Sequence, residues 1–207
     1  MTNFKTFISH LEIELKNPLP GKGAQNKLLP VTRKQYPDEP DLSRARPSSV
    51  LILFYPQNDL PHIVFIQRPQ YDGVHSGQIA FPGGKAEDTD DNLRETALRE
   101  TSEEIGVNPH DVRIIGKLSE LYIPPSNYIV APYVGYLDYK PVLKPDPKEV
   151  SGIIQVKFNE IIDEKCFQYR EITSLGQKYR VPCFYVQGKI IWGATSMILN
   201  ELLEIIN

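Results

Sequence analysis

Three glutamates in one short segment have the spacing of a metal-binding site. Glu103 and Glu104 follow Glu100 by three and four residues, and Arg99 directly precedes the group. On a helix these positions adjoin, and like charges there cost roughly 0.2–0.5 kcal/mol per pair. Mg²⁺ or Mn²⁺ would relieve the repulsion, because both ions prefer carboxylate oxygens and leave positions for water and phosphate. Arg99 could orient one carboxylate. The simpler alternative is a solvated acidic helix face with a surface ion pair of little worth.

A helix must position these carboxylates, and the flanking residues predict one that ends near Ile105. Asp90, Asp91 and Asn92 offer N-caps, and Gly106 supplies a C-terminal stop. Five residues fall within an arc of roughly 140° and should face the core: Leu93, Ala97, Leu98, Thr101 and Ile105. The glutamates adjoin this arc, so we expect them at a boundary between core and solvent.

A glycine pair, Gly83 and Gly84, lies shortly before this helix and follows a short strand expected at 78–81. Glycine lets the backbone approach a ligand closely or fold tightly against the acidic face. An ordinary turn would have the same sequence. Lys85, directly after the pair, is a nearby cation that could hold phosphate.

The remaining pattern predicts an α/β fold. Apolar runs at 49–55 and 62–67 indicate a hairpin, and the chain after the acidic helix is rich in short β-type runs. Helices are expected at 158–164 and 193–206. Without regular alternation of strand and helix, the pattern favours a mixed sheet packed by helices over a doubly wound parallel sheet.

The first 47 residues differ from the rest. Apolar residues from Phe4 to Leu15 recur at helical spacing, so an amphipathic helix should end near Asn17 and Pro18. Frequent Pro and Gly predict an irregular arm over 18–47. We therefore expect an N-terminal helix and arm (1–47), followed by one catalytic domain (48–207).

Composition excludes several classes of function. The net charge of −3 over 207 residues comes from interspersed charges, without a basic block for nucleic acid or an anionic membrane. Cys166 and Cys183 lack metal-site spacing, so free thiols in a cytoplasmic protein are expected. No signal peptide or membrane span is apparent. A homodimer is compatible with the sequence.

The segment 84–107 resembles the Nudix box: Gly, five residues, Glu, seven residues, Arg-Glu, an apolar residue, any residue, Glu-Glu, any residue, Gly, an apolar residue. The match covers Arg99, Glu100, Glu103, Glu104, Gly106 and Val107. Asp91 stands at the position of the first Glu, counted back from Arg99, and is not taken as a site residue. Gly84 lies one residue too far upstream, and Thr101 replaces the apolar residue. The resemblance implies a Nudix-type α/β/α sandwich with a central mixed sheet.

The stretch 64–85 is similar to the extension of the coenzyme A diphosphatase branch. Six positions match: Arg68, Gly77, Phe81, Pro82, Gly83 and Gly84. Pro69 and Gly73 replace a small residue and a second Arg. The residues 192–195 also look like the start of the branch's closing helix. The resemblance points to substrate contacts from Arg68, Gly83 and Gly84, and we expect Lys85, as a nearby cation, to contact the substrate as well.

The expected activity is metal-dependent hydrolysis of the pyrophosphate bond of coenzyme A, giving 3′,5′-ADP and 4′-phosphopantetheine. Glu100, Glu103 and Glu104 would bind Mg²⁺ or Mn²⁺, and a metal-activated water would attack phosphorus. The base would be Glu104 or a carboxylate from another loop, for which Glu149 is a candidate, although a solvated loop residue is its simpler interpretation. The alternatives are a broader pyrophosphatase of ADP-ribose or NADH, and a nucleotide sensor without catalysis.

Overall fold

The structure is a computed structural model that describes residues 3–30, 42–73, 75–174 and 176–206. The helices are α1 (Phe4–Glu14), α2 (Lys22–Gln25), α3 (Leu93–Ile105), α4 (Phe158–Ile162) and α5 (Gly193–Ile206). The strands are β1 (Arg46–Gln57), β2 (Leu60–Gln67), β3 (Ile79–Ala80), β4 (Gly83–Lys85), β5 (Arg113–Lys117), β6 (Leu121–Ile123), β7 (Tyr128–Tyr136), β8 (Gly152–Lys157), β9 (Phe167–Ser174), β10 (Gln177–Val186) and β11 (Lys189–Trp192). No helix within these ranges is long and apolar enough to span a bilayer.

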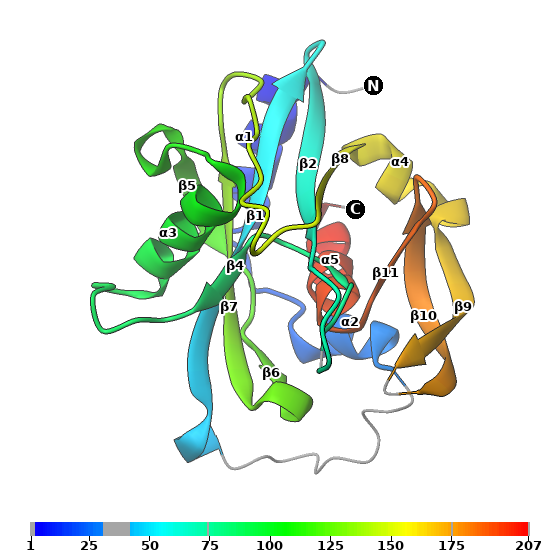
Figure 1. Cartoon of the computed structure of the whole chain (residues 1–207). Coiled ribbons are helices and arrows are strands. Elements are labelled where there is room, and N and C mark those ends of the chain that lie inside the picture. Colours follow the sequence, from blue (N-terminus) through cyan, green and yellow to red (C-terminus); the bar gives the residue numbers. More distant parts are fainter. Residues whose placement is uncertain (1–2, 31–41, 74, 175, 207) are drawn as a thin grey trace.

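A mixed sheet of eight strands forms the centre of the molecule (Figure 1). Its main path runs β3-β2-β1-β7-β5, and β4, β6 and β8 pair with β1, β7 and β2. Strands β1 and β7 are parallel, whereas β1 and β2 form the predicted hairpin. Asn58 and Asp59 turn the hairpin with φ of 52° and 60°, a conformation that Asn and Asp tolerate better than most residues.

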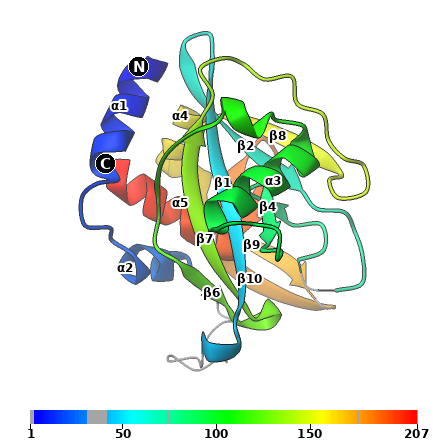
Figure 2. The same ribbon diagram turned by 90° about the vertical axis from the view of Figure 1, so that its left-hand side faces the viewer.

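The two faces of this sheet are covered by different helices (Figure 2). Alternate residues of β1 point to opposite faces, as the two-residue period of a strand requires. Leu51 and Leu53 pack with α3, whereas Ile52 and Phe54 pack with α1 and α5. The predicted sandwich of a mixed sheet between helices is thereby confirmed.

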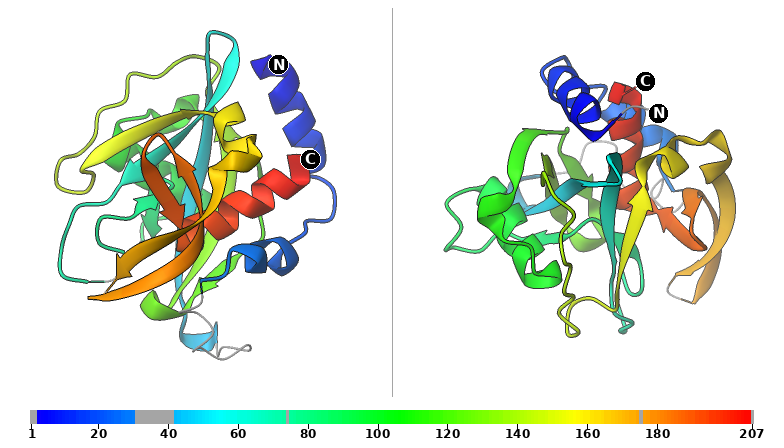
Figure 3. Two further views of the ribbon diagram at one scale, coloured as in Figure 1. Left: turned by 90° about the vertical axis from the view of Figure 1, so that its right-hand side faces the viewer. Right: turned by 90° about the horizontal axis from the view of Figure 1, so that it is seen from above.

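The N-terminal segment is part of the main core. Helix α1 was predicted, and its Phe7 ring lies 5.0 Å from the ring of Phe54. The expected irregular structure is replaced at 22–28 by α2 and one 3₁₀ turn, with Gln25 buried. Gln25 donates a hydrogen bond of 2.8 Å from Nε2 to buried Glu201 of α5, and Figure 3 shows α1, α2 and α5 on one side of the molecule. Residues 31–41 of the arm lie outside the described ranges.

A second, antiparallel sheet of order β11-β10-β9 stands beside the first one. Strands β9 and β10 correspond to expected β-type runs, whereas β11 was not anticipated. The two predicted C-terminal helices are present as α4 and α5. Because α5 follows β11 directly, the second sheet connects to the helix that covers one face of the first.

Candidate active site

Helix α3 begins and ends where its sequence predicts. The Asn92 side chain accepts hydrogen bonds from the backbone N of Arg94 and of Glu95 at 2.9 and 3.2 Å. Gly106 ends the helix in the left-handed conformation, with its N–H donating to the Ser102 carbonyl at 2.9 Å. These caps determine which residues reach the sheet and which line its edge.

Three carboxylates converge beside α3. One oxygen each from Glu100, Glu104 and Glu149 lies within 4.8 Å of the other two. Glu104 is only 4% exposed, and its Oε2 accepts a 2.8 Å hydrogen bond from the backbone N of Gly83. Glu103, which the sequence assigned to the same metal site, is instead 53% exposed and accepts a 2.9 Å hydrogen bond from Arg99. The structure thus brings together two of the three predicted ligands and adds Glu149.

Glu149 reaches the site because its loop docks on the end of α3. The backbone N of Lys144 donates to the Ile105 carbonyl at 2.9 Å, and that of Asp146 donates to the Glu104 carbonyl at 3.0 Å. A turn then returns the chain, with the Glu149 N bonded to the Asp146 carbonyl at 3.1 Å. The position of Glu149 therefore favours a role in the acidic cluster over a loop residue that only contacts solvent.

Arg99 is held by a carboxylate that sequence reasoning missed. Its Nε and Nη2 donate to the two oxygens of Asp90 at 2.8 and 2.9 Å. Asp90 also accepts from Thr96 Oγ1 at 2.9 Å and from the Glu87 backbone at 3.0 Å. These bonds, chiefly those from Arg99, hold the pKa of Asp90 well below its ordinary value. Asp91, at the corresponding position of the family pattern, is exposed.

A spacing signal could have identified Asp90. Counted forward from Gly84, five residues intervene before Asp90, which is the separation between Gly and Glu in the Nudix box. The additional residue thus falls between Asp90 and Arg99. Arg99 also donates to Glu100 Oε1 at 3.1 Å, so Asp90 orients an arginine that in turn contacts the acidic cluster.

The glycine pair fits tightly between β1 and the acidic helix. Gly83 has a φ of 146°, and a Cβ there would lie 2.3 Å from the Ser49 carbonyl oxygen. At Gly84 a Cβ would lie 2.5 Å from the Glu100 carboxyl carbon. Any side chain at these positions would displace β1 or a candidate metal ligand, so the pair is more than an ordinary turn.

The protein alone disfavours charge in the acidic cluster. Burial raises the pKa of Glu104 to about 8, against the opposing effects of the Gly83 N–H and the Arg68 charge. Burial also raises the pKa of Glu100. Burying neighbouring carboxylates in their charged form is unfavourable, and a bound divalent cation would restore that form. The oxygen-only donor set fits Mg²⁺ or Mn²⁺.

A cavity of about 610 Å³ opens over these carboxylates. Glu100, Glu104 and Glu149 line it together with three cationic residues, Arg68, Lys85 and Lys148, and with both glycines of the pair. The Nε of Arg68 is buried and makes no hydrogen bond within the described part of the chain. A buried, unpaired guanidinium nitrogen is costly unless a ligand such as phosphate accepts from it.

His75 and Thr195 also line this cavity, whereas the two cysteines lie elsewhere. His75 lines the cavity and pairs through Nδ1 with Gln78 Oε1 at 3.1 Å, and burial lowers its pKa. Cys166 and Cys183 are free and buried in the protein interior. Burial raises the pKa of Cys166 to about 11, which makes it a poor nucleophile. Thr195 bonds the Ile79 carbonyl at 3.0 Å and lines the cavity.

The mixed sheet between helices thus carries an acidic helix whose glutamates face a cavity that cationic residues also line. A model of the NUDIX domain matches residues 45–175. "Uncharacterized Nudix hydrolase NudL" of Photorhabdus laumondii subsp. laumondii is 33% identical over 144 residues, covering 70% of this chain and 76% of the relative. A protein with the same description from Yersinia enterocolitica is 31% identical over 147 residues, covering 71% and 75%.

The fold is similar to that of a crystal structure of a MutT/nudix family protein from Enterococcus faecalis. The TM-score is 0.51 at 13% identity, over 83% of this chain and 66% of that chain. The chain belongs to the Nudix family. Nudix hydrolases cleave pyrophosphate bonds with divalent metals, and the cluster of Glu100, Glu104 and Glu149 is consistent with such a site.

Proposed function

We propose that this Nudix hydrolase cleaves the pyrophosphate bond of coenzyme A. The observation that carries the proposal is the buried, unpaired Nε of Arg68 in a cavity that also holds the acidic cluster. Arg68 belongs to the motif that resembles the coenzyme A diphosphatase branch. The products would be 3′,5′-ADP and 4′-phosphopantetheine.

The acidic residues divide the catalytic tasks. A divalent metal held there would neutralise phosphate charge and make a bound water more acidic. Glu100 and Glu104 provide buried oxygens, with Arg99 orienting Glu100 and the Gly83 N–H orienting Glu104. We retain Glu103 as a ligand proposed from the family pattern, although its carboxylate is paired with Arg99 here.

We assign the general base to Glu149. Glu104, the other candidate, is nearly fully buried and engaged by Gly83, whereas Glu149 is exposed and borne on a loop. An exposed carboxylate can take a proton from the attacking water and release it to solvent. Glu104 then serves to bind and orient.

The cationic residues would hold the substrate phosphates. Arg68 can donate two parallel hydrogen bonds to a phosphate, while Lys85 and Lys148 act as point charges. Pro69 and Gly73 depart from the branch motif, which keeps ADP-ribose and NADH as alternative substrates. Three convergent carboxylates argue against a sensor without catalysis, since a sensor does not need to activate water.

The test is a comparison of substrates with matched variants. Purified protein is incubated with coenzyme A, ADP-ribose or NADH in Mg²⁺ or Mn²⁺, and the products are resolved by mass. We expect coenzyme A to have the highest kcat/KM, with no turnover in excess chelator. Glu104→Gln should be inactive and Glu95→Gln, on the same helix outside the cluster, should retain activity. A preference for ADP-ribose would refute the substrate, and turnover by Glu104→Gln would refute the site.

A further inference from the structure

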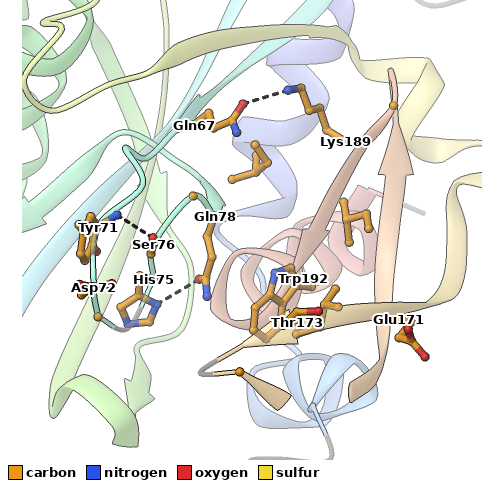
Figure 4. A pocket seen from close by; sticks show the side chains of 17 residues that line it. Gln67, Tyr71, Asp72, His75, Ser76, Gln78, Glu171, Thr173, Lys189 and Trp192 are labelled. Carbon is orange, nitrogen blue, oxygen red and sulfur yellow. Dashed lines mark hydrogen bonds between the residues drawn. The ribbon is translucent and has the colours of Figure 1, made fainter. Parts of the chain in front are cut away.

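A second cavity of about 640 Å³ lies beside the catalytic one. It is bounded by the loop that follows β2 and by strands β9 and β11 of the smaller sheet. In Figure 4, Tyr71, Asp72 and His75 lie on one side, and Thr173 and Trp192 lie on the other. The larger sheet and the smaller sheet thus each supply one wall.

The two cavities share part of their lining. Tyr71, His75 and Gln78 line both of them, and His75 and Gln78 are joined by their 3.1 Å hydrogen bond. The two cavities therefore adjoin at His75 and Gln78.

The charges of the two cavities differ. The catalytic cavity holds three cationic residues, Arg68, Lys85 and Lys148, beside the carboxylates of the proposed metal site. The described lining of the second cavity holds one cationic residue, Lys189, which donates a 2.9 Å hydrogen bond to Gln67, together with Asp72 and Glu171. A site with this balance disfavours further phosphates.

The rest of the lining suits an uncharged chain. Four glycines line the cavity, Gly73, Gly77, Gly176 and Gly188, and the side chains of Ser76, Gln78 and Thr173 add polar groups. Trp192, half-buried at the end of β11, adds an aromatic surface. Hydrogen-bonding groups beside an aromatic wall match a flexible arm that carries amides and methylenes.

We infer that the second cavity binds the part of the substrate on the other side of the scissile diphosphate from the nucleotide, which is an uncharged arm that carries amides. Trp192 is the specificity-determining residue of this cavity. The inference rests on the proposed function, because it takes the arm to be that of a coenzyme A-type substrate. The nucleotide and its charges stay in the catalytic cavity, and the pantetheine-like chain passes His75 and Gln78.

Tryptophan fluorescence tests occupancy without catalysis. Trp192 is the only tryptophan of the chain, so its emission reports on this cavity. We expect 4′-phosphopantetheine to change the emission saturably in metal-free protein, and 3′,5′-ADP to leave it unchanged. Thr173→Phe, which fills the cavity, should abolish the change, whereas Gln177→Phe, exposed on the neighbouring strand outside the lining, should not. An unchanged emission with 4′-phosphopantetheine, or an equal response in both variants, would overturn the inference.

Kinetics separate this inference from the proposed function. Loss of an aromatic contact should lower kcat/KM for coenzyme A about 3- to 10-fold in Trp192→Ala. Hydrolysis of the methyl ester of 3′-phospho-ADP, which lacks the arm, should change less than twofold, and Trp192→Phe should restore much of the loss. Equal losses on both compounds would overturn the assignment of Trp192. If wild type does not hydrolyse coenzyme A, the proposed function fails, and the fluorescence titration alone decides what the cavity binds.

Discussion

Replacing Glu104 by Gln should stabilise the metal-free protein while inactivating it. Burial raises the pKa of this carboxyl from 4.5 to about 8, so the folded state binds the proton more tightly than the unfolded state. The stability of wild type therefore falls as the pH rises from about 4.5 to about 8. Integrated to pH 7, the loss is about 3 kcal/mol, and at pH 5 it is about 1 kcal/mol. The Gln side-chain oxygen can still accept the hydrogen bond from Gly83, so the variant avoids the loss.

The assay is urea unfolding in excess chelator at pH 5 and pH 7. Glu104→Gln should have the higher free energy of unfolding at pH 7, with a smaller difference at pH 5. Glu103→Gln is the matched control, because its side chain is exposed and its ion pair with Arg99 contributes at most about 1 kcal/mol. Added Mg²⁺ should stabilise wild type but not Glu104→Gln. The kcat of this variant should be at least about 100-fold below that of wild type. A less stable Glu104→Gln at pH 7, or a gain independent of pH, would refute the reasoning.

Three further substitutions test neighbouring parts of the site. Asp90→Asn removes the carboxylate that holds Arg99 and should cost about 3–5 kcal/mol in urea unfolding, together with most of the activity. Gly84→Ala places a Cβ against the Glu100 carboxyl and should weaken Mn²⁺ binding, measured by calorimetry, about 10-fold or more with the fold retained. Arg68→Ala should lower kcat/KM for coenzyme A about 10- to 150-fold, and by less for 3′-dephospho-coenzyme A.

Each of these has an outcome that would contradict it. Asp91→Asn, at an exposed neighbouring position, should change the free energy of unfolding by less than about 0.5 kcal/mol. Equal effects of Asp90→Asn and Asp91→Asn would show that Asp90 does not hold Arg99 in place. Wild-type Mn²⁺ affinity in Gly84→Ala would show that Glu100 is not a ligand. Equal losses on all substrates in Arg68→Ala would remove its part in specificity.

The helix that carries the acidic cluster could be derived from local patterns. Asn92 caps its start, Gly106 ends it, and the spacing of Glu100 and Glu104 places both carboxylates at the edge of the apolar stripe. The hairpin of β1 and β2 likewise follows from two short apolar runs and from the turn residues between them, such as Asn58. These features depend on residues a few positions apart, whose side-chain types carry the signal.

Other parts of the site depended on contacts between segments that are distant along the chain. Glu149 joins Glu104 because the loop at 144–150 docks on α3 through backbone hydrogen bonds, which almost any residue can make and which therefore leave no pattern of side-chain types. Asp90 rather than Asp91 holds Arg99 because the loop before α3 turns it inward. The second cavity exists because β11 pairs with β10 opposite the loop after β2, and only the packing of the two sheets brings those surfaces together.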